Sequence, residues 1–137
     1  ILASDHAGFE LKETIKRFLQ EKRKKVLDLG TKNTNSVDYP DFAHLLSKKM
    51  KTNKNNIGIL ICGSGIGMAM TANRHKNIRA ALCYNTKSAM LSRKHNNANV
   101  IALGSRLTKK DVALRCINIF LKTAFDGGRH LRRVKKI

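Results

Sequence analysis

The chain has 137 residues, and its 28 lysines and arginines against 9 aspartates and glutamates give a formal charge of +19 at pH 7. Hydrophobic residues make up 42% of the sequence and charged residues 27%, which is ordinary globular usage and excludes a wholly disordered protein. No apolar run approaches the roughly 18 residues of a membrane helix, and no secretory leader is visible. We therefore expect a single domain over residues 1–137, located in the cytoplasm and without a membrane partner.

The positive charge favours anionic partners such as nucleic acids, anionic lipids or phosphorylated metabolites. The lysines are spread over the whole chain, however, and no zinc-finger spacing, RNA-binding aromatic motif or basic zipper accompanies them. Lysine and asparagine also share A/T-rich codons, so nucleotide bias is one explanation of the excess. We expect no nucleic acid partner, and a polyanion-binding module is the less favoured alternative function.

Short apolar runs alternate with stretches of helical periodicity along the chain. The predicted strands are residues 1–3, 26–29, 57–61, 78–82 and 100–103. The predicted helices are residues 9–20, one from Pro40, one from the glycine-rich turn 63–67 to about Arg74, residues 86–95, and one from Thr108. Five strand–helix repeats indicate an α/β fold, a Rossmann-like three-layer sandwich with helices on both faces of a parallel sheet. The expected order of its five strands is 2-1-3-4-5, and the tail 126–137 lies outside the repeat.

Ligands of open parallel sheets bind beyond the carboxyl ends of the strands, where the strand order reverses. In the expected order this crevice lies between strands 1 and 3. The loops that follow those strands are residues 4–8 and 62–67, which are also the two loops richest in reactive side chains. We therefore expect the functional site at this edge.

The glycine-rich loop 63–67 fits neither common nucleotide motif. A dinucleotide fingerprint requires glycine where Met68 stands, and the Lys-Ser/Thr pair of a Walker loop is absent, so neither NAD nor ATP is implied. What remains is a nest of backbone N–H groups at a helix start, which attracts an anion. The alternative is a tight turn that needs glycine for its geometry alone.

Cys62 ends the third predicted strand and comes directly before this nest. A thiol near a helix N-terminus has its thiolate form stabilised, and beside a group of oxyanion-binding amides it can abstract a proton. The alternative is a buried cysteine at a strand end. Cys83 and Cys116 lie in apolar surroundings and are predicted to be small buried hydrophobes. Three widely spaced cysteines argue against a disulfide framework.

Other polar residues have two interpretations each. Asp5 and His6 follow the first strand and can bind sugar hydroxyls or a phosphate, although an aspartate here can also cap the next helix. His95 ends a helix. Considered alone, it is explained by a favourable interaction with the helix dipole. If the tail is helical, Arg129 and Arg133 share one face and can clamp a phosphate; the alternative is a solvated basic tail.

Six segments together resemble, in order and spacing, the type B ribose-5-phosphate isomerases over essentially the whole chain. They are Asp5-His6-Ala7-Gly8, Asp38-Tyr39-Pro40, Cys62-Gly63-Ser64-Gly65-Ile66-Gly67, His95-Asn96, Gly104-Ser105-Arg106 and Gly127-Gly128-Arg129-His130. Galactose 6-phosphate and allose 6-phosphate isomerases of the same superfamily look similar. The resemblance implies interconversion of ribose 5-phosphate and ribulose 5-phosphate in the non-oxidative pentose phosphate pathway, without a metal or cofactor, and it leaves a six-carbon substrate open.

The resemblance also implies roles for particular residues. It makes Cys62 the base that moves a proton between C1 and C2, and His95 the proton donor that helps to open the furanose ring. The backbone of Gly63, Ser64, Gly65, Ile66 and Gly67 would hold the enediolate oxygens. Asp5, His6, Tyr39 and Asn96 would bind the sugar, and His6, Arg106, Arg129 and Arg133 would surround the phosphate. It further implies a homodimer or a dimer of dimers with sites shared between subunits, in which the tail 126–137 contributes to phosphate binding and to the interface.

Overall fold

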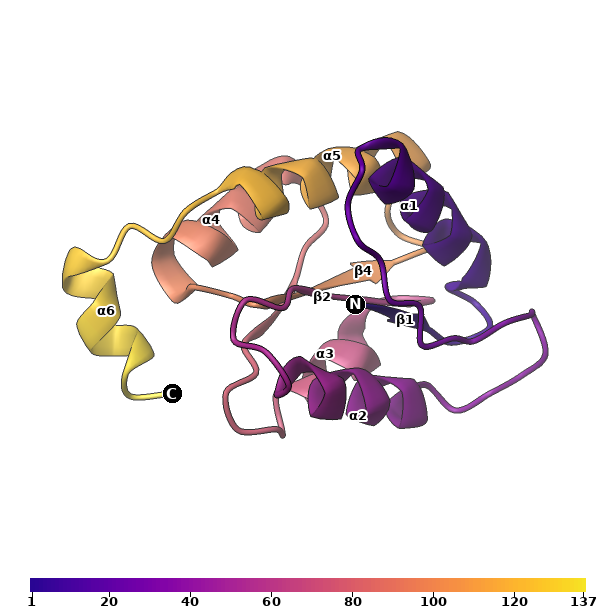
Figure 1. Cartoon of the computed structure of the whole chain (residues 1–137), viewed down its shortest axis with the longest axis horizontal. Helices are drawn as coiled ribbons and strands as arrows, with labels where there is room; N and C mark the ends of the chain where they lie inside the picture. The colour runs from indigo at the N-terminus through magenta and orange to yellow at the C-terminus, as the bar shows by residue number, and fades with distance from the viewer.

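The structure, a computed structural model, describes residues 1–137 and consists of one parallel sheet with helices on both faces (Figure 1). In chain order the elements are β1 (Leu2–Ser4), α1 (Phe9–Glu21), α2 (Tyr39–Met50), β2 (Gly58–Cys62), α3 (Ile66–Ala72), β3 (Ala80–Leu82), α4 (Thr86–Asn96), β4 (Val100–Gly104), α5 (Lys110–Lys122) and α6 (Gly128–Val134). The predicted α/β fold with a parallel sheet between two layers of helices is confirmed.

The sheet has four strands where the sequence predicted five. Residues 26–29 run beside β1, and the Leu29 amide donates to the Leu2 carbonyl at 2.9 Å, but only Asp28 forms a β-bridge. A continued ladder would join the Ser4 amide to the Leu29 carbonyl, whereas it donates to Gly30 instead. Because Gly30 has a φ of +105°, outside the extended region, the pairing stops after one bridge.

The predicted strand order is wrong in its last two positions. The observed order is β1-β2-β4-β3, so β4 lies at the centre and β3 at the edge. All five residues of β4 are buried, whereas the three residues of β3 are half-buried, and the longer apolar strand takes the place covered on both faces. The chain returns toward the centre after β3, so a right-handed crossover places α4 on the opposite face from α2 and α3.

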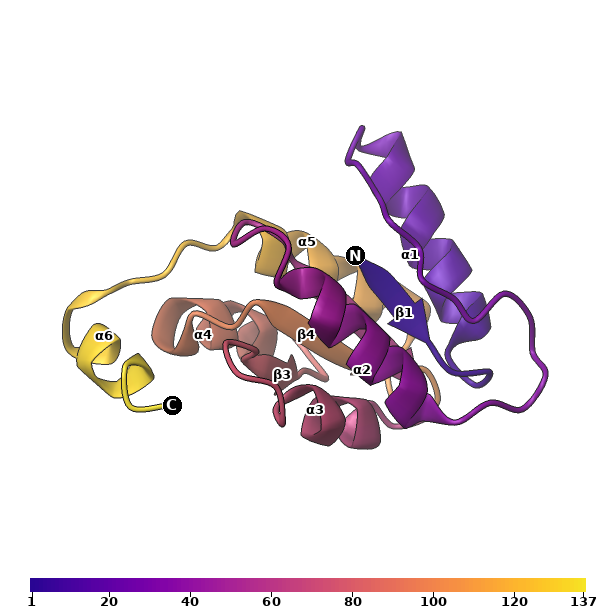
Figure 2. The ribbon, with the colours of Figure 1, turned by 60° about the horizontal axis from the view of Figure 1, so that its bottom comes forward.

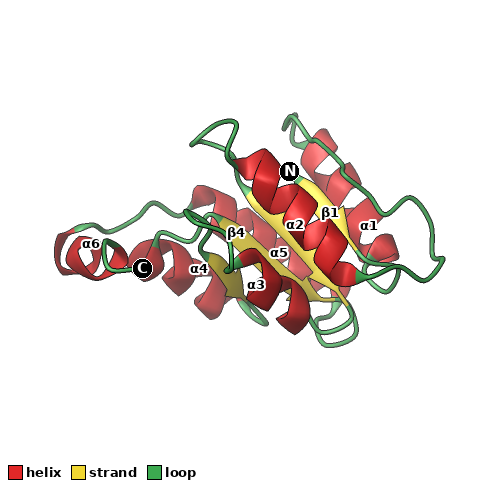
Figure 3. Cartoon of the chain, turned by 90° about the horizontal axis from the view of Figure 1, so that it is seen from below, coloured by secondary structure: helices red, strands yellow, loops and turns green.

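Two apolar cores lie on the two faces of the sheet, because successive strand residues point to opposite sides. Helices α1, α4 and α5 cover one face, and α2 and α3 lie side by side on the other (Figures 1 and 3). Cys83 and Cys116 are fully buried in the first core, as predicted. Cys62 belongs to the second core, beneath α2 and α3.

Helix α6 lies at one end of the molecule beside α4, after the extended segment 123–127 (Figure 2). None of its residues is buried. The tail therefore lies outside the strand–helix repeat, as its sequence indicated. No helix of the chain combines the length and the apolar character that a membrane span requires.

Candidate active site

The loops that follow β1, β2 and β4 meet at the carboxyl edge of the sheet, and Ser105 joins all three. Its hydroxyl donates to the Ala7 carbonyl at 2.8 Å and lies 3.2 Å from the Cys62 carbonyl, which also accepts from the Ser105 amide at 2.9 Å. The next amide, that of Arg106, donates to the Gly63 carbonyl at 3.0 Å. These bonds hold Cys62, the glycine loop and Arg106 in one fixed arrangement.

The Cys62 sulfur faces the glycine loop. Cys62 is the last residue of β2 and is 5% exposed, and its Sγ accepts a hydrogen bond from the Gly65 amide at 3.1 Å. Gly65 has a φ of +79°, the left-handed region, and this conformation turns the chain so that its amide points back toward the sulfur at the start of α3. The sulfur therefore lies where aligned amides carry partial positive charge, which stabilises an anion.

A second amide of the loop is also engaged. The Ile66 amide donates to the Ser64 hydroxyl at 3.3 Å, one residue along from the bond to sulfur. Two consecutive N–H groups at the start of α3 thus donate to side-chain acceptors, and consecutive amides of this kind can bind an anion. An oxyanion placed between them would replace a sulfur and a hydroxyl as the acceptor.

A pocket of about 300 Å³ opens above the sulfur. Its lining comes from all three loops and from the start of α2. The lining residues are Asp5, Tyr39, Cys62, Gly63, Ser64, Gly67, Arg106 and Leu107. The structure thus brings together a thiol, a carboxylate, a phenol and a guanidinium around main-chain amides.

Asp5 is buried at the end of β1 and lines the pocket. Its Oδ1 accepts from the Gly8 amide at 2.9 Å, which braces the start of α1. No group of the chain donates to its Oδ2, so this oxygen is available to a ligand in the pocket. Asp5 therefore does not cap α1 itself, because the cap residue is Gly8, and its binding role stays a prediction.

Tyr39 forms one wall of the pocket. It is the first residue of α2, and its ring lies directly over Gly67, where an added Cβ would come within 2.6 Å of the ring carbons. His6 lies behind this wall rather than in the lining: its Nδ1 accepts from the Val37 amide at 3.2 Å. His6 is thus tied to the loop that leads into Tyr39.

Four predicted site residues lie elsewhere in the chain: His95, Asn96, Arg129 and Arg133. His95 and Asn96 end α4, and the two arginines belong to α6. Because α4 runs back against the parallel strands, it ends at the edge of the sheet opposite Cys62 (Figure 1). The ring of His95 stacks on His130 at 4.2 Å instead. One chain by itself does not bring these residues to the pocket.

Two residues of the site were not predicted. Ser105 carries a recognisable signal, because a small hydroxyl directly after a buried strand can bond neighbouring loops, yet only Arg106 was singled out in that segment. Leu107 lines the pocket with a largely exposed side chain, and nothing in the sequence distinguishes it from any other leucine. No group of three or more histidine, cysteine, aspartate or glutamate side chains is arranged to hold a metal ion.

The fold and this site define a class: a parallel α/β protein with a thiol over main-chain amides at the carboxyl edge. A family model described as Ribose/Galactose Isomerase matches residues 1–137. The chain is 44% identical to a probable ribose-5-phosphate isomerase B of Mycoplasma pneumoniae, over 99% of this chain and 90% of that protein. It is 40% identical to ribose-5-phosphate isomerase B of Escherichia coli, over 97% and 89%.

Solved structures of similar proteins point to the same family. The structure of a ribose 5-phosphate isomerase from Thermotoga maritima matches with a TM-score of 0.96 and 49% identity, over 98% of this chain and 93% of that chain. Ribose-5-phosphate isomerase B from Mycoplasma genitalium, solved with bound ribulose-5-phosphate, matches with a TM-score of 0.95 and 45% identity, over 98% and 90%. The chain belongs to the ribose/galactose isomerase family.

Proposed function

We propose that this protein is an aldose–ketose isomerase that interconverts ribose 5-phosphate and ribulose 5-phosphate. The observation that carries the proposal is the 3.1 Å hydrogen bond from the Gly65 amide to the Cys62 sulfur, inside a pocket that also holds Asp5 and Arg106. Aldose–ketose isomerisation needs a base, a stabilised enediolate and an open-chain sugar. The pocket supplies the first two from residues that are adjacent in space.

In the proposed mechanism Cys62, as thiolate, removes the proton from C2 of the open-chain aldose. The electron pair moves into a C1–C2 double bond, and the resulting cis-enediolate oxygens take the amides of the loop 63–67 as hydrogen-bond donors. A proton passes from O2 to O1, the same sulfur returns the carbon proton to C1, and O2 becomes the carbonyl oxygen of the ketose. Loss of one donor in comparable oxyanion sites costs on the order of 10²–10³ in rate. The amides therefore matter about as much as the base.

The remaining groups are assigned to binding. Asp5 and Tyr39 line the pocket and are placed to hydrogen-bond sugar hydroxyls, with His6 beside them. Arg106 lies at the pocket, where its guanidinium can take the phosphate in a bidentate contact. Holding the non-reacting phosphate orients C1 and C2 against the sulfur. No step calls for a metal or a cofactor.

His95, Asn96, Arg129 and Arg133 enter this proposal through a second copy of the chain. They are gathered at the α4–α6 end, away from the pocket of their own chain, and α6 buries none of its residues. A homodimer that sets this end against the partner's pocket would add a proton donor for ring opening and two arginines for the phosphate. The site would then be complete only in a dimer or a dimer of dimers, with the tail 126–137 at the interface.

A six-carbon sugar phosphate is the second candidate substrate, because the matching family is described for both ribose and galactose. A coupled assay with ribose 5-phosphate, allose 6-phosphate and galactose 6-phosphate, without added metal, decides between them. Cys62→Ala is expected to abolish turnover of the preferred substrate. Cys83→Ala, at an equally buried cysteine outside the pocket, is the matched control and should retain turnover. Undiminished turnover in Cys62→Ala would refute the mechanism.

A further inference from the structure

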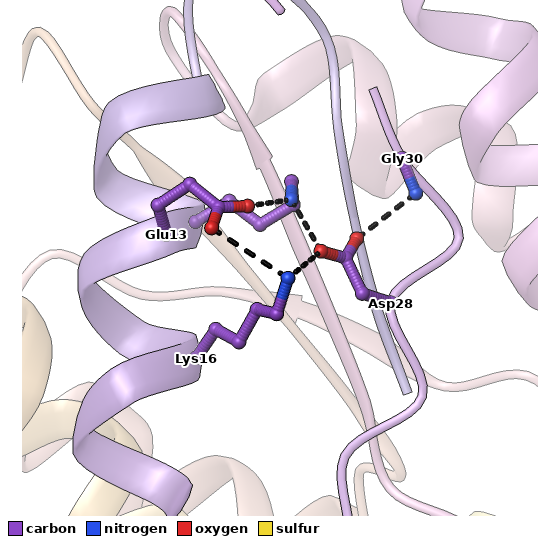
Figure 4. A network of polar contacts seen from close by, with 5 residues as sticks. Glu13, Lys16, Asp28 and Gly30 are labelled. Atoms are coloured by element: carbon purple, nitrogen blue, oxygen red, sulfur yellow. Dashed lines mark hydrogen bonds and ion pairs between the residues drawn. The ribbon is translucent and has the colours of Figure 1, made fainter. Parts of the chain in front are cut away.

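A fully buried lysine, Lys12, belongs to an ionic network none of whose residues lines the pocket. Figure 4 shows the network with Glu13, Lys16, Asp28 and Gly30 labelled. The side chain of Lys12, on α1, has 0% exposure, and its Nζ donates to Asp28 Oδ2 at 2.7 Å and to Glu13. Lys16, one turn further along α1, donates to the same Asp28 oxygen at 2.9 Å. Two lysines of one helix thus converge on a single carboxylate.

The other oxygen of Asp28 holds the backbone that follows it. Asp28 Oδ1 accepts from the Gly30 amide at 3.0 Å. Directly beyond, the Ser4 amide donates to the Gly30 carbonyl at 2.8 Å, and the Thr31 amide donates to the Ser4 carbonyl at 2.9 Å. Ser4 is the residue before Asp5 of the pocket. The network therefore fixes residues 28–31 against the end of β1.

Residues 31–38 then cross the surface without helix or strand and end at the pocket. At their far end the Val37 amide donates to His6 Nδ1 at 3.2 Å, and Tyr39 follows at the start of α2. The five residues between Thr31 and Val37 are exposed. Since a segment of this kind has little packing of its own, its two anchored ends determine its path.

We propose that Lys12 and Asp28 are positioning residues of the substrate pocket, which set the start of the 31–38 loop and through it the places of His6 and Tyr39. The inference rests on the proposed isomerase function for its kinetic consequence, but not for its structural one. Neither residue lines the pocket, so both act through the loop.

Stability alone is a poor explanation of this network. Removing a lysine and carboxylates from water costs about as much as their attraction returns, and apolar replacements of buried ion pairs are often neutral or stabilising. What an apolar pair could not supply is the directed bond from Asp28 to Gly30. Burial by itself raises the pKa of Asp28, yet hydrogen bonds from Lys12, Lys16 and Gly30 bring it to about 2, so the carboxylate stays charged and holds this geometry at neutral pH.

The test is Asp28→Asn in the full-length chain, with Lys12→Met as the second variant. Steady-state kinetics with ribose 5-phosphate should show a KM raised on the order of ten-fold, with kcat within about two-fold of wild type. KM should change without kcat because Cys62 is held by hydrogen bonds to Gly65 and Ser105, and no residue of the 31–38 loop takes part in these bonds. Hydrogen exchange of the substrate-free protein should be faster at the amides of Thr31 and Val37.

Asp111→Asn is the matched control, because it removes a 2.7 Å ion pair with Arg115 on an exposed face of α5. Neither KM nor loop exchange should change in that variant. A folded Asp28→Asn protein with wild-type KM, or with wild-type exchange in the loop, overturns the inference. If the wild-type chain isomerises no sugar phosphate, the proposed function fails, and the exchange measurement alone decides about the positioning role. If Lys12→Met does not fold, Asp28→Asn decides, since asparagine has the size of aspartate but only one acceptor oxygen, which cannot serve both the two lysines and the Gly30 amide.

Discussion

The imidazole rings of His95 and His130 lie nearly parallel, with their centroids 4.2 Å apart and an interplanar angle of 6°. The stack joins the end of α4 to α6, and Arg129 and Arg133 lie on the same short helix as His130. One contact therefore sets the position of the proposed proton donor relative to both proposed phosphate ligands. None of these residues lines the Cys62 pocket of its own chain.

Acidification is expected to loosen α6 from α4. Partial desolvation lowers the pKa of His130 below its ordinary value of 6.5, and the neighbouring His95, Arg129 and Arg133 lower it further, against a smaller opposing effect of Asp126. Because the docked helix favours neutral His130, docking is fully stable above pH 6.5 and weakens as the pH falls through the lowered pKa. Hydrogen exchange of α6 amides between pH 8 and pH 5, corrected for intrinsic rates, measures this. An unchanged pH dependence in His130→Ala would contradict the assignment.

Gly65→Ala is expected to damage both the fold and the reaction. Its Cβ would lie 2.6 Å from Leu82 Cδ1 and 2.8 Å from the Leu103 main chain, in addition to left-handed strain of roughly 1–2 kcal/mol. Moving the amide away from the sulfur should lower kcat by on the order of 10²-fold or more. Urea unfolding and kcat/KM are the measurements.

Gly127→Ala is the control for the stability effect of Gly65→Ala. Gly127 also has a positive φ, +65°, but an added Cβ there meets nothing within 4 Å. Its ψ of −135° lies outside the left-handed helical region, so we expect it to lose only strain energy, on the order of 1–3 kcal/mol. Equal losses of stability in the two variants would show that the collision with Leu82 and Leu103 does not occur.

Two inactive variants should restore each other if the sites are shared. Cys62→Ala removes the proposed base from its own pocket, and His95→Ala removes the proposed acid from the partner's pocket. A mixed dimer then has one intact site and one doubly altered site, since closed dimers are isologous. Random mixing after subunit exchange should restore about a quarter of wild-type activity. No recovery in samples where mass spectrometry detects mixed dimers would contradict shared sites.

Asp28→Asn is expected to cost stability at neutral pH but much less in acid. The Asp28 carboxylate has its pKa lowered from 3.8 to about 2, so its contribution is present above pH 3.8 and is lost as the pH falls through about 2. Discounted for solvent screening, the expected loss is about 1–2 kcal/mol at pH 7. Urea midpoints of both proteins between pH 7 and pH 2 test this. A difference that stays constant over that range would assign the effect to packing rather than charge.

Local sequence patterns were enough to predict several elements of this fold and site. The apolar run 57–61, the cysteine that ends it and the glycine-rich turn after it are neighbours in sequence, so strand, thiol and amide nest could be predicted together. The same holds for the buried Cys83 and Cys116, because apolar surroundings along the chain already indicate burial. The crevice between the first and third predicted strands was also placed correctly, since its two loops follow strands that do lie side by side.

Tertiary structure decided what depends on partners distant in sequence. Residues 26–29 have the composition of a strand, but a positive φ at Gly30 limits their pairing to one bridge. The order of the last two strands followed from which of them is covered on both faces, and that depends on how the helices pack as well as on the apolar run of β4. Lys12 resembles any other lysine of a basic chain until α1 packs against residues 26–29.

The sequence by itself determined the fold class, the family and the chemistry available at the end of β2, because each of these depends on short segments whose residues are neighbours in the chain. Only the three-dimensional structure decided that His95, Asn96, Arg129 and Arg133 lie away from Cys62 in one chain. The physical reason is that α4 must run back against the parallel strands, which carries its last turn to the opposite edge of the sheet.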